Sequence, residues 1–120
     1  MSDASDYFEN LIVDSHLAGA TKPWLALFTD ATLDSGSGTE VTGGAYARQE
    51  VTLRSGSAGV TTNSGSVSVW VPTCTVTNAA LMTLSNAGSM LVHGGLAATV
   101  ACTSGDTVTF ADGAISVTVT

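Results

Sequence analysis

The sequence predicts a mainly β protein: an antiparallel β-sandwich or jelly roll with one N-terminal α-helix. Short runs of alternating apolar and polar residues recur along most of the chain, as in Val67–Val71 and residues 115–119. Turn sequences such as Asp112-Gly113 separate these runs. A helical period occurs only near the N-terminus. The length of 120 residues predicts one domain over residues 1–120, with one modest core.

The helix is expected over residues of about 5–18, from a stripe of side chains three and four positions apart: Tyr7, Phe8, Leu11, Ile12 and Ser15. Asp6 and Glu9 have the spacing of a capping box, and Ser2 and Ser5 are alternative caps. Gly19 and Pro23 should end the helix.

The β-sandwich is expected over residues of about 23–120. The run 24–29 is almost wholly apolar, which is typical of a strand covered on both faces, with the helix a candidate cover for one of them. A long loop should follow at residues 30–45. Further strands are expected at residues 48–54, 66–71, 79–84, 90–94, 99–102, 107–110 and 115–119, with turns at 86–89, 104–106 and 112–113.

Charge is scarce and unevenly distributed. Only 11% of the residues are charged and the formal net charge is −7. Lys22, Arg48 and Arg54 are too few cations to neutralise a nucleic acid backbone, so we expect no nucleic-acid partner. No run is apolar over the ~20 residues that a bilayer requires, so we expect no membrane partner. Residues 55–105 contain no Asp, Glu, Lys or Arg, which favours a surface covered by other protein chains over a solvated Ser/Thr surface.

One block has the chemistry of a structural corner. Two glycines allow a backbone bend, a tyrosine can cover a core edge, and an arginine can pair bidentately with Glu40 or Glu50. The predicted corner motif is Glu40, Gly43, Gly44, Tyr46 and Arg48. A phosphate-binding loop is excluded because the glycine spacing matches no phosphate-binding motif and no helix pattern follows.

The same block, Glu40-Val-Thr-Gly-Gly-Ala-Tyr-Ala-Arg-Gln49 with Val51 and Leu53, resembles a signature of small virion structural proteins of tailed phages. Other parts of the chain extend the resemblance: Leu27-Phe28-Thr29, Asn63, Gly105-Asp106-x-Val108-x-Phe110 and Gly113-x-Ile115-x-Val117. Members of this family are described as tail-fibre-like, and similar small sandwiches serve as capsid cement (decoration) proteins. The resemblance implies a structural role in a virion.

The residues that could carry catalysis or bind a metal form no motif. His16 lies near the predicted helix end, and His93 ends a strand. Cys74 and Cys102 lack a CxxC spacing, and in a chain without a signal peptide we expect them to be reduced, mostly as buried small side chains. The acidic loop residues Asp30, Asp34 and Glu40 do not have the spacing of an EF-hand. We therefore expect no enzyme, no cofactor and no metal.

These observations favour a capsid decoration protein, made in the host cytoplasm and bound to the capsid exterior. Its expected partners are the major capsid protein and other copies of itself in a homotrimer. The alternative is a tail or tail-fibre-associated module, structural or receptor-binding. The candidate interface lies in the charge-free region, at Ser68, Trp70, Leu81 and Met82.

Overall fold

The computed structural model describes residues 4–19 and 21–119. Strands account for 43% of the chain and helices for 10%, the sheets are antiparallel, and one helical segment stands at the N-terminus. The predicted fold class is confirmed. The part of the chain that the structure describes contains no helix that is long and apolar enough to cross a membrane.

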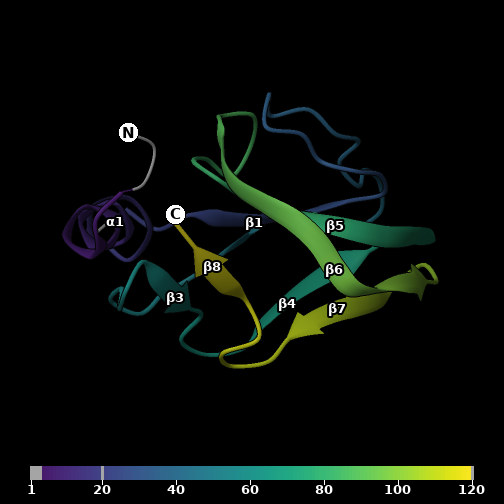
Figure 1. The fold of residues 1–120 in the computed structure, drawn as a ribbon. Helices are drawn as coiled ribbons and strands as arrows, with labels where there is room; N and C mark the ends of the chain where they lie inside the picture. The colour runs from purple at the N-terminus through teal and green to yellow at the C-terminus, as the bar shows by residue number, and fades with distance from the viewer. Residues whose placement is uncertain (1–3, 20, 120) are drawn as a thin grey trace. The chain divides into compact units, whose positions relative to one another are not determined.

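Two compact units make up the chain (Figure 1). Unit 1 combines Met1–Pro23, Val51–Val67 and Phe110–Thr120. Unit 2 combines Trp24–Glu50 and Ser68–Thr109. Each unit therefore joins segments that are distant in sequence. That the two units form a single domain stays a prediction.

The helical segment of unit 1 consists of α1 (Asp6–Ile12), which continues into the π-helical turn η1 (Val13–Leu17). Ser5 is the N-cap, and its hydroxyl accepts a hydrogen bond from the Phe8 amide at 3.3 Å. Of the three predicted caps, the structure therefore selects Ser5, while Ser2 lies outside the described residues. Helical structure ends at Leu17, within a residue of the prediction.

The helix packs on the glycine-rich segment that precedes strand β3 (Val60–Thr62). The Asn10 and Asp14 side chains, one helical turn apart, accept hydrogen bonds from the Gly59 and Gly56 amides, both at 2.8 Å. Val13 is wholly buried, and a Cβ placed on Gly56 would approach its side chain to 2.9 Å. Because Gly56 and Gly59 have no side chains, the helix can come close to the backbone of this segment.

The face of the helix that packs within unit 1 is not the face that carries the apolar stripe of the sequence. The stripe that contains Tyr7, Phe8 and Leu11 is exposed, with 77%, 52% and 46% of each residue accessible, whereas Val13 and Leu17 are buried. That the helix covers one face of the strand predicted at residues 24–29 stays a prediction. Because Asn10, Val13, Asp14 and Leu17 share one helical face, a mixed polar and apolar surface makes the contact and the aromatic side points away.

Unit 1 also contains a short antiparallel pair, β3 (Val60–Thr62) with β8 (Ser116–Thr118). The run 115–119 predicted β8, but no pattern predicted β3. The predicted strand 48–54 is mostly absent: only Gln49–Glu50 forms strand β2, and Leu53 makes an isolated bridge to Asn63. The run divides because the Val51 amide bonds to the Pro23 carbonyl and leaves the sheet of unit 2.

Unit 2 is built on a four-stranded antiparallel sheet in the order β2-β1-β5-β6, in which β6 is Met90–Cys102. Strand β1 (Trp24–Phe28) lies between β2 and β5 (Cys74–Met82), and its last four residues are buried, as its apolar run predicted. Ala26, Phe28, Ala80 and Met82 form a core cluster against which Met90 packs.

The predicted strands 90–94 and 99–102 are one strand, β6 (Met90–Cys102). It bends between the pairs Val76↔Val100 and Asn78↔Gly95, where residues 96–99 of β6 lie opposite Thr77 alone. A bulge of this kind bends a strand without ending it. Residues 95–98 have the sequence Gly-Leu-Ala-Ala, which interrupts the alternation of apolar and polar residues. The strand nevertheless continues through them. Likewise, β5 begins at Cys74, before the predicted start at residue 79.

The strands β4 (Val67–Val71) and β7 (Asp106–Phe110) pair as a second sheet (Figure 1). Strand β4 alternates between buried valines and an exposed Ser68 and Trp70, as its sequence pattern predicted. Across the pair, the hydroxyls of Ser68 and Thr109 are 2.9 Å apart. The outer face of this sheet is therefore uncharged and rich in hydroxyl groups.

The glycine at position 59 offers a test of the helix contact. Its φ is +75°, and an added Cβ would stand 2.5 Å from Glu9 Oε2 of α1 and 2.6 Å from the Val119 carbonyl oxygen. Gly113, with φ of +79°, has nothing within 4 Å of the same position. We expect Gly113→Ala to lower the free energy of unfolding by about 1 kcal/mol, from backbone strain alone, and Gly59→Ala by about 2–4 kcal/mol, from strain plus overlap.

Urea denaturation of the two alanine variants measures this difference. Equal losses of stability would contradict the close packing around Gly59.

Candidate functional site

The predicted corner motif forms a connected polar network in unit 2. Arg48 pairs with Glu40, and not with Glu50, through two bonds: Nε to Oε2 at 2.9 Å and Nη2 to Oε1 at 2.7 Å. The Tyr46 hydroxyl donates to Glu40 Oε2 at 2.6 Å and accepts from the Leu27 amide at 3.1 Å. The network thus fixes the end of the long loop to strand β1.

Arg48 also reaches a second segment. Its Nη1 donates to the carbonyl oxygens of Leu84 at 2.9 Å and Ala87 at 2.7 Å, in the turn between β5 and β6. The arginine side chain is 7% exposed and that of Glu40 is 25% exposed. One guanidinium therefore ties together a loop, a strand and a hairpin, and it is held in place by charge-assisted bonds.

The environment shifts the pKa values of all three groups. Burial raises the pKa of Glu40, but hydrogen bonds from Arg48 and Tyr46 and the arginine charge outweigh it, so the pKa lies below its ordinary value of 4.5. Burial, followed by the hydrogen bond to Glu40, raises the pKa of Tyr46. The hydrogen bond to Glu40 also raises the pKa of Arg48. At neutral pH the network consists of an ion pair and a neutral phenol.

The two glycines of the motif shape the turn that precedes Tyr46. Gly43 has φ of +99° and Gly44 has φ of +58°, which side chains rarely allow. The Tyr46 amide donates to the Gly43 carbonyl at 3.2 Å and closes the turn. The turn positions the tyrosine so that its hydroxyl reaches Glu40.

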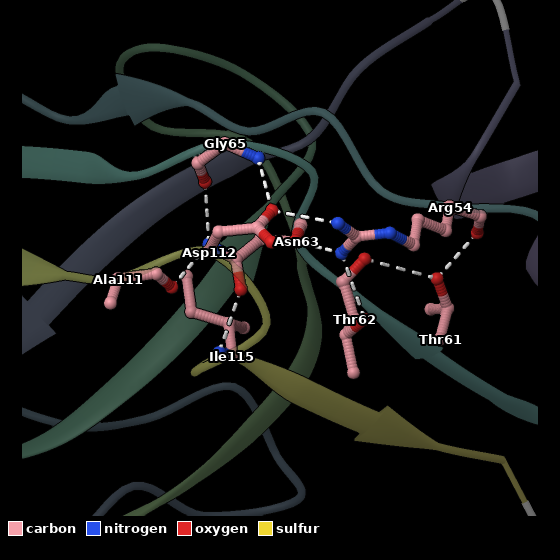
Figure 2. Close-up of polar contacts among 8 residues, drawn as sticks. All are labelled: Arg54, Thr61, Thr62, Asn63, Gly65, Ala111, Asp112 and Ile115. Carbon is pink, nitrogen blue, oxygen red and sulfur yellow. Dashed lines mark hydrogen bonds and ion pairs between the residues drawn. The ribbon is translucent and has the colours of Figure 1, made fainter.

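A second polar network, in unit 1, centres on Asn63, which is wholly buried (Figure 2). Its side-chain amide donates to the carbonyls of Gly65 at 2.7 Å and Ala111 at 3.0 Å, and its Oδ1 accepts from the Ile115 amide at 2.8 Å. Its own amide and carbonyl bond to Ile115 and Gly113. The side chain thus substitutes for a strand partner in a region where the backbone is irregular.

Arg54 and Asp112 extend this network (Figure 2). Arg54 donates through Nη1 to the Asn63 carbonyl and through Nη2 to Asp112 Oδ1 at 2.7 Å. The same carboxylate oxygen accepts from the Gly65 amide at 2.7 Å, and these two bonds, the amide first, lower the pKa of Asp112. Asn63 was one of the single residues that extended the family resemblance, but no pattern predicted this role.

The acidic loop is ordered by hydrogen bonds and does not gather its carboxylates. Asp30 accepts from the amide and hydroxyl of Thr39 at 2.6 and 2.7 Å, and these bonds lower its pKa. Glu40 bonds to Arg48, and Asp34 lies 2.8 Å from His93 Nε2. Within the described ranges, no group of three or more His, Cys, Asp or Glu side chains is placed to hold a metal ion.

Thr32, His93 and Asp34 form a chain of contacts that resembles a hydrolase triad in composition. The Thr32 hydroxyl is 2.8 Å from His93 Nδ1, and His93 Nε2 is 2.8 Å from Asp34 Oδ1. Thr32 is only 7% exposed, so its hydroxyl is shielded from a substrate, and the carboxylate at the far end is fully exposed. The arrangement fits a structural link between the loop and β6 better than an activated nucleophile.

His16, the other histidine of the chain, lies exposed in the last turn of η1.

The predicted interface residues separate into two groups. Ser68 and Trp70 lie on the outer face of β4, and Trp70 is 52% exposed. Leu81 and Met82 are 2% and 6% exposed and belong to the interior of unit 2. Including Leu81 and Met82 in a surface was wrong, because β5 is a central strand whose C-terminal half is covered.

Cys102 is buried and Cys74 is half-buried, and the two are not bonded to one another in this structure. That the thiols are reduced in the cell stays a prediction. The structure adds that the two cysteines are register partners on β5 and β6. No sequence pattern predicts this pairing, because a turn and a bulge lie between the two cysteines.

The fold and its two polar networks define a small β protein whose loops are held by directed side-chain bonds. A family model described as podophage GP4 fiber I protein gp80 matches residues 3–118, and the chain belongs to this family. The predicted resemblance to small phage virion structural proteins is confirmed. A search of the curated proteins finds no match.

The Tyr46 hydroxyl can be tested by removing one oxygen atom. Tyr46→Phe leaves the Leu27 amide without its partner and removes a donor to Glu40, so we expect it to lower the free energy of unfolding by about 1–3 kcal/mol. Tyr7→Phe is the matched control, because the Tyr7 ring is 77% exposed, and it should change stability by less than about 0.5 kcal/mol. Similar effects in urea denaturation would argue against the network.

Acid should weaken the corner network. Because the folded pKa of Glu40 lies below its value in the unfolded chain, the stability it contributes is present above about pH 4.5 and is lost as the pH falls further. We expect Glu40→Gln to cost about 2 kcal/mol at pH 7, since it leaves Arg48 buried without its countercharge. The variant should also show a smaller loss of stability between about pH 5 and pH 3. Parallel pH profiles for the two proteins would contradict this account.

Proposed function

We propose that this chain is a structural subunit of a fibre-type appendage on a podophage virion. The observation that carries the proposal is the match of residues 3–118 to a family described as a podophage fibre protein. The fold is consistent with it: the sheets are small and antiparallel, and Arg48 in unit 2 and Arg54 in unit 1 hold the loops. On this proposal the chain acts by adhesion and carries no catalytic activity.

Capsid decoration is the second candidate, favoured by the distribution of charge. Residues 55–105 contain no charged side chain, although the chain as a whole carries −7. Copies with that net charge repel one another wherever acidic surfaces meet, so an uncharged region is the natural place for contacts between copies or with a capsid lattice. In this case the partners are the major capsid protein and two further copies in a homotrimer.

In both cases we propose that the outer face of β4 contributes to the contact. Trp70 is a large, half-exposed aromatic side chain, a residue type enriched at the centres of interfaces. Its neighbour Ser68, with Thr109 across the pair, adds hydroxyls that can bond to a partner backbone. Charged residues are absent from this strand.

The two functions differ in location and copy number. Labelling purified virions with an antibody against the chain, followed by electron microscopy, should place it on a fibre or tail. Quantitative mass spectrometry should then give far fewer copies than of the major capsid protein. A copy number comparable with that of the capsid protein, with label over the shell, would replace the fibre proposal by decoration. Absence from the virion would contradict both.

The interface is tested by a charge placed on the outer face of β4. Ser68→Glu should reduce incorporation into virions by about tenfold or more, because a charge desolvated without a partner costs more than about 1.4 kcal/mol. Ser35→Glu adds the same charge to the exposed acidic loop and should leave incorporation unchanged. Equal incorporation of the two variants, with equal melting temperatures, would exclude the β4 face.

A further inference from the structure

Cys74 and Cys102 occupy directly opposite positions in an antiparallel ladder. Cys74 is the first residue of β5, Cys102 is the last residue of β6, and the two are register partners. Opposite residues in such a ladder have Cα atoms about 4.5–5.5 Å apart. Disulfides span Cα distances of about 4.4–6.8 Å. The Cα distances of hydrogen-bonded and of non-hydrogen-bonded antiparallel pairs therefore both fall within the range in which a disulfide needs no backbone movement.

The two thiols differ in accessibility. Cys74 is half-buried, whereas Cys102 is 7% exposed and its sulfur contacts the Val100 carbonyl at 3.7 Å. Burial, with a further contribution from the adjacent Cys74, raises the pKa of Cys102. A small disulfide reagent from solution should therefore react first at Cys74, and Cys102 should react with the sulfur already beside it.

The position of the pair gives a bridge a structural role. Cys74↔Cys102, Thr75↔Ala101 and Val76↔Val100 form a short stretch of ladder that the bulge at residues 96–99 separates from the rest of the β5–β6 pairing. A stretch this short has few hydrogen bonds of its own. A disulfide between Cys74 and Cys102, the last pair of this stretch, would keep its two strands paired.

We propose that Cys74 and Cys102 form a cross-strand disulfide once the chain leaves the reducing cytosol. The setting rests on the proposed virion function, because virion surfaces meet oxidising conditions outside the cell. During synthesis the pair is expected to stay reduced, because the cytosol keeps thiols reduced.

The oxidant is a low-molecular-weight disulfide such as oxidised glutathione. The Cys74 thiolate attacks one glutathione sulfur, the glutathione S–S bond breaks, and one glutathione leaves as a thiolate that takes up the proton lost by Cys74. The Cys102 thiolate then attacks Cys74 Sγ, and the second glutathione leaves and takes up the second proton. Two protein thiols are oxidised and one glutathione disulfide is reduced to two thiols.

The experiment uses the purified full chain, first reduced and then incubated with oxidised glutathione. After alkylation of the remaining thiols, intact mass should show the loss of two hydrogens and no added alkyl group or glutathione. Peptide mapping without reductant should recover the segments around Cys74 and Cys102 as one linked species. The bridge closes a long loop of the chain, so the melting temperature should rise by roughly 10 °C.

Two serine variants separate the steps. Cys102→Ser should retain one glutathione on Cys74, because no thiol is present to displace it. Cys74→Ser should remain largely unmodified at the buried Cys102. Neither variant should gain thermal stability on oxidation. A wild-type chain that keeps glutathione on Cys74 while Cys102 stays free, or that forms only links between chains, overturns the proposal.

A second measurement keeps this inference distinct from the proposed function. Virions are alkylated immediately after release and the chain is mapped in the same way, with the bridged form expected. If the purified chain forms the bridge but virions contain both thiols alkylated, the disulfide proposal fails and the fibre proposal is unaffected. If the chain is absent from virions, the fibre proposal fails, while the bridge in the purified chain still establishes the reactivity of the pair.

Discussion

The loops of this protein are held by arginine side chains that bond to main-chain carbonyls and to a carboxylate at the same time. Two of the chain's three basic residues serve this purpose. Arg48 joins Glu40 to the carbonyls of Leu84 and Ala87, and Arg54 joins Asp112 to the carbonyl of Asn63. A small protein buries a smaller fraction of its surface than a large one, so packing alone orders its long connections poorly. Guanidinium groups supply several directed bonds each and lose little freedom in doing so.

The two networks differ in how strongly they depend on charge. The Arg48 and Glu40 side chains are 7% and 25% exposed, whereas those of Arg54 and Asp112 are 44% and 59% exposed. Salt and water screen the second pair, so its carboxylate serves chiefly as an acceptor for the Gly65 amide. In unit 1 the neutral, wholly buried Asn63 carries the larger share of the loop order. Unit 2 therefore relies on an ion pair and unit 1 on an amide.

The sequence predicted what depends on local patterns and missed what depends on distant partners. Short stretches of the sequence show the alternation in β4 and β8 and the apolar run of β1. They also show the hydrogen-bonding groups of the corner motif. The orientation of α1 is not, because the contact depends on Asn10 and Asp14 meeting the amides of residues 56 and 59. An apolar stripe indicates a helix, but it does not state which side packs when glycines elsewhere offer backbone donors.

The bulge in β6 shows the same limit for registers. Residues 96–99 lie opposite one residue of β5, and no turn residue marks the position. The alternation of apolar and polar residues therefore cannot predict which residues of β5 and β6 are paired beyond residue 95. The pairing of Cys74 with Cys102 lies in that region. Asn63 was visible only as part of a resemblance, since a buried asparagine and a turn asparagine have the same sequence context.

Because both arginines and Asn63 bond to main-chain atoms, the residues they hold are constrained in position but not in identity. The turn between β5 and β6 is fixed through the carbonyls of Leu84 and Ala87, and its side chains take no part in those bonds. Identity is restricted in this turn by the backbone instead, because Ala87 and Gly88 have φ of +56° and +76° and the Thr83 hydroxyl accepts a hydrogen bond from the Ser89 amide. Sequence changes that keep the path of the turn are therefore expected at Ser85 and Asn86, which lie between the two held carbonyls and are exposed.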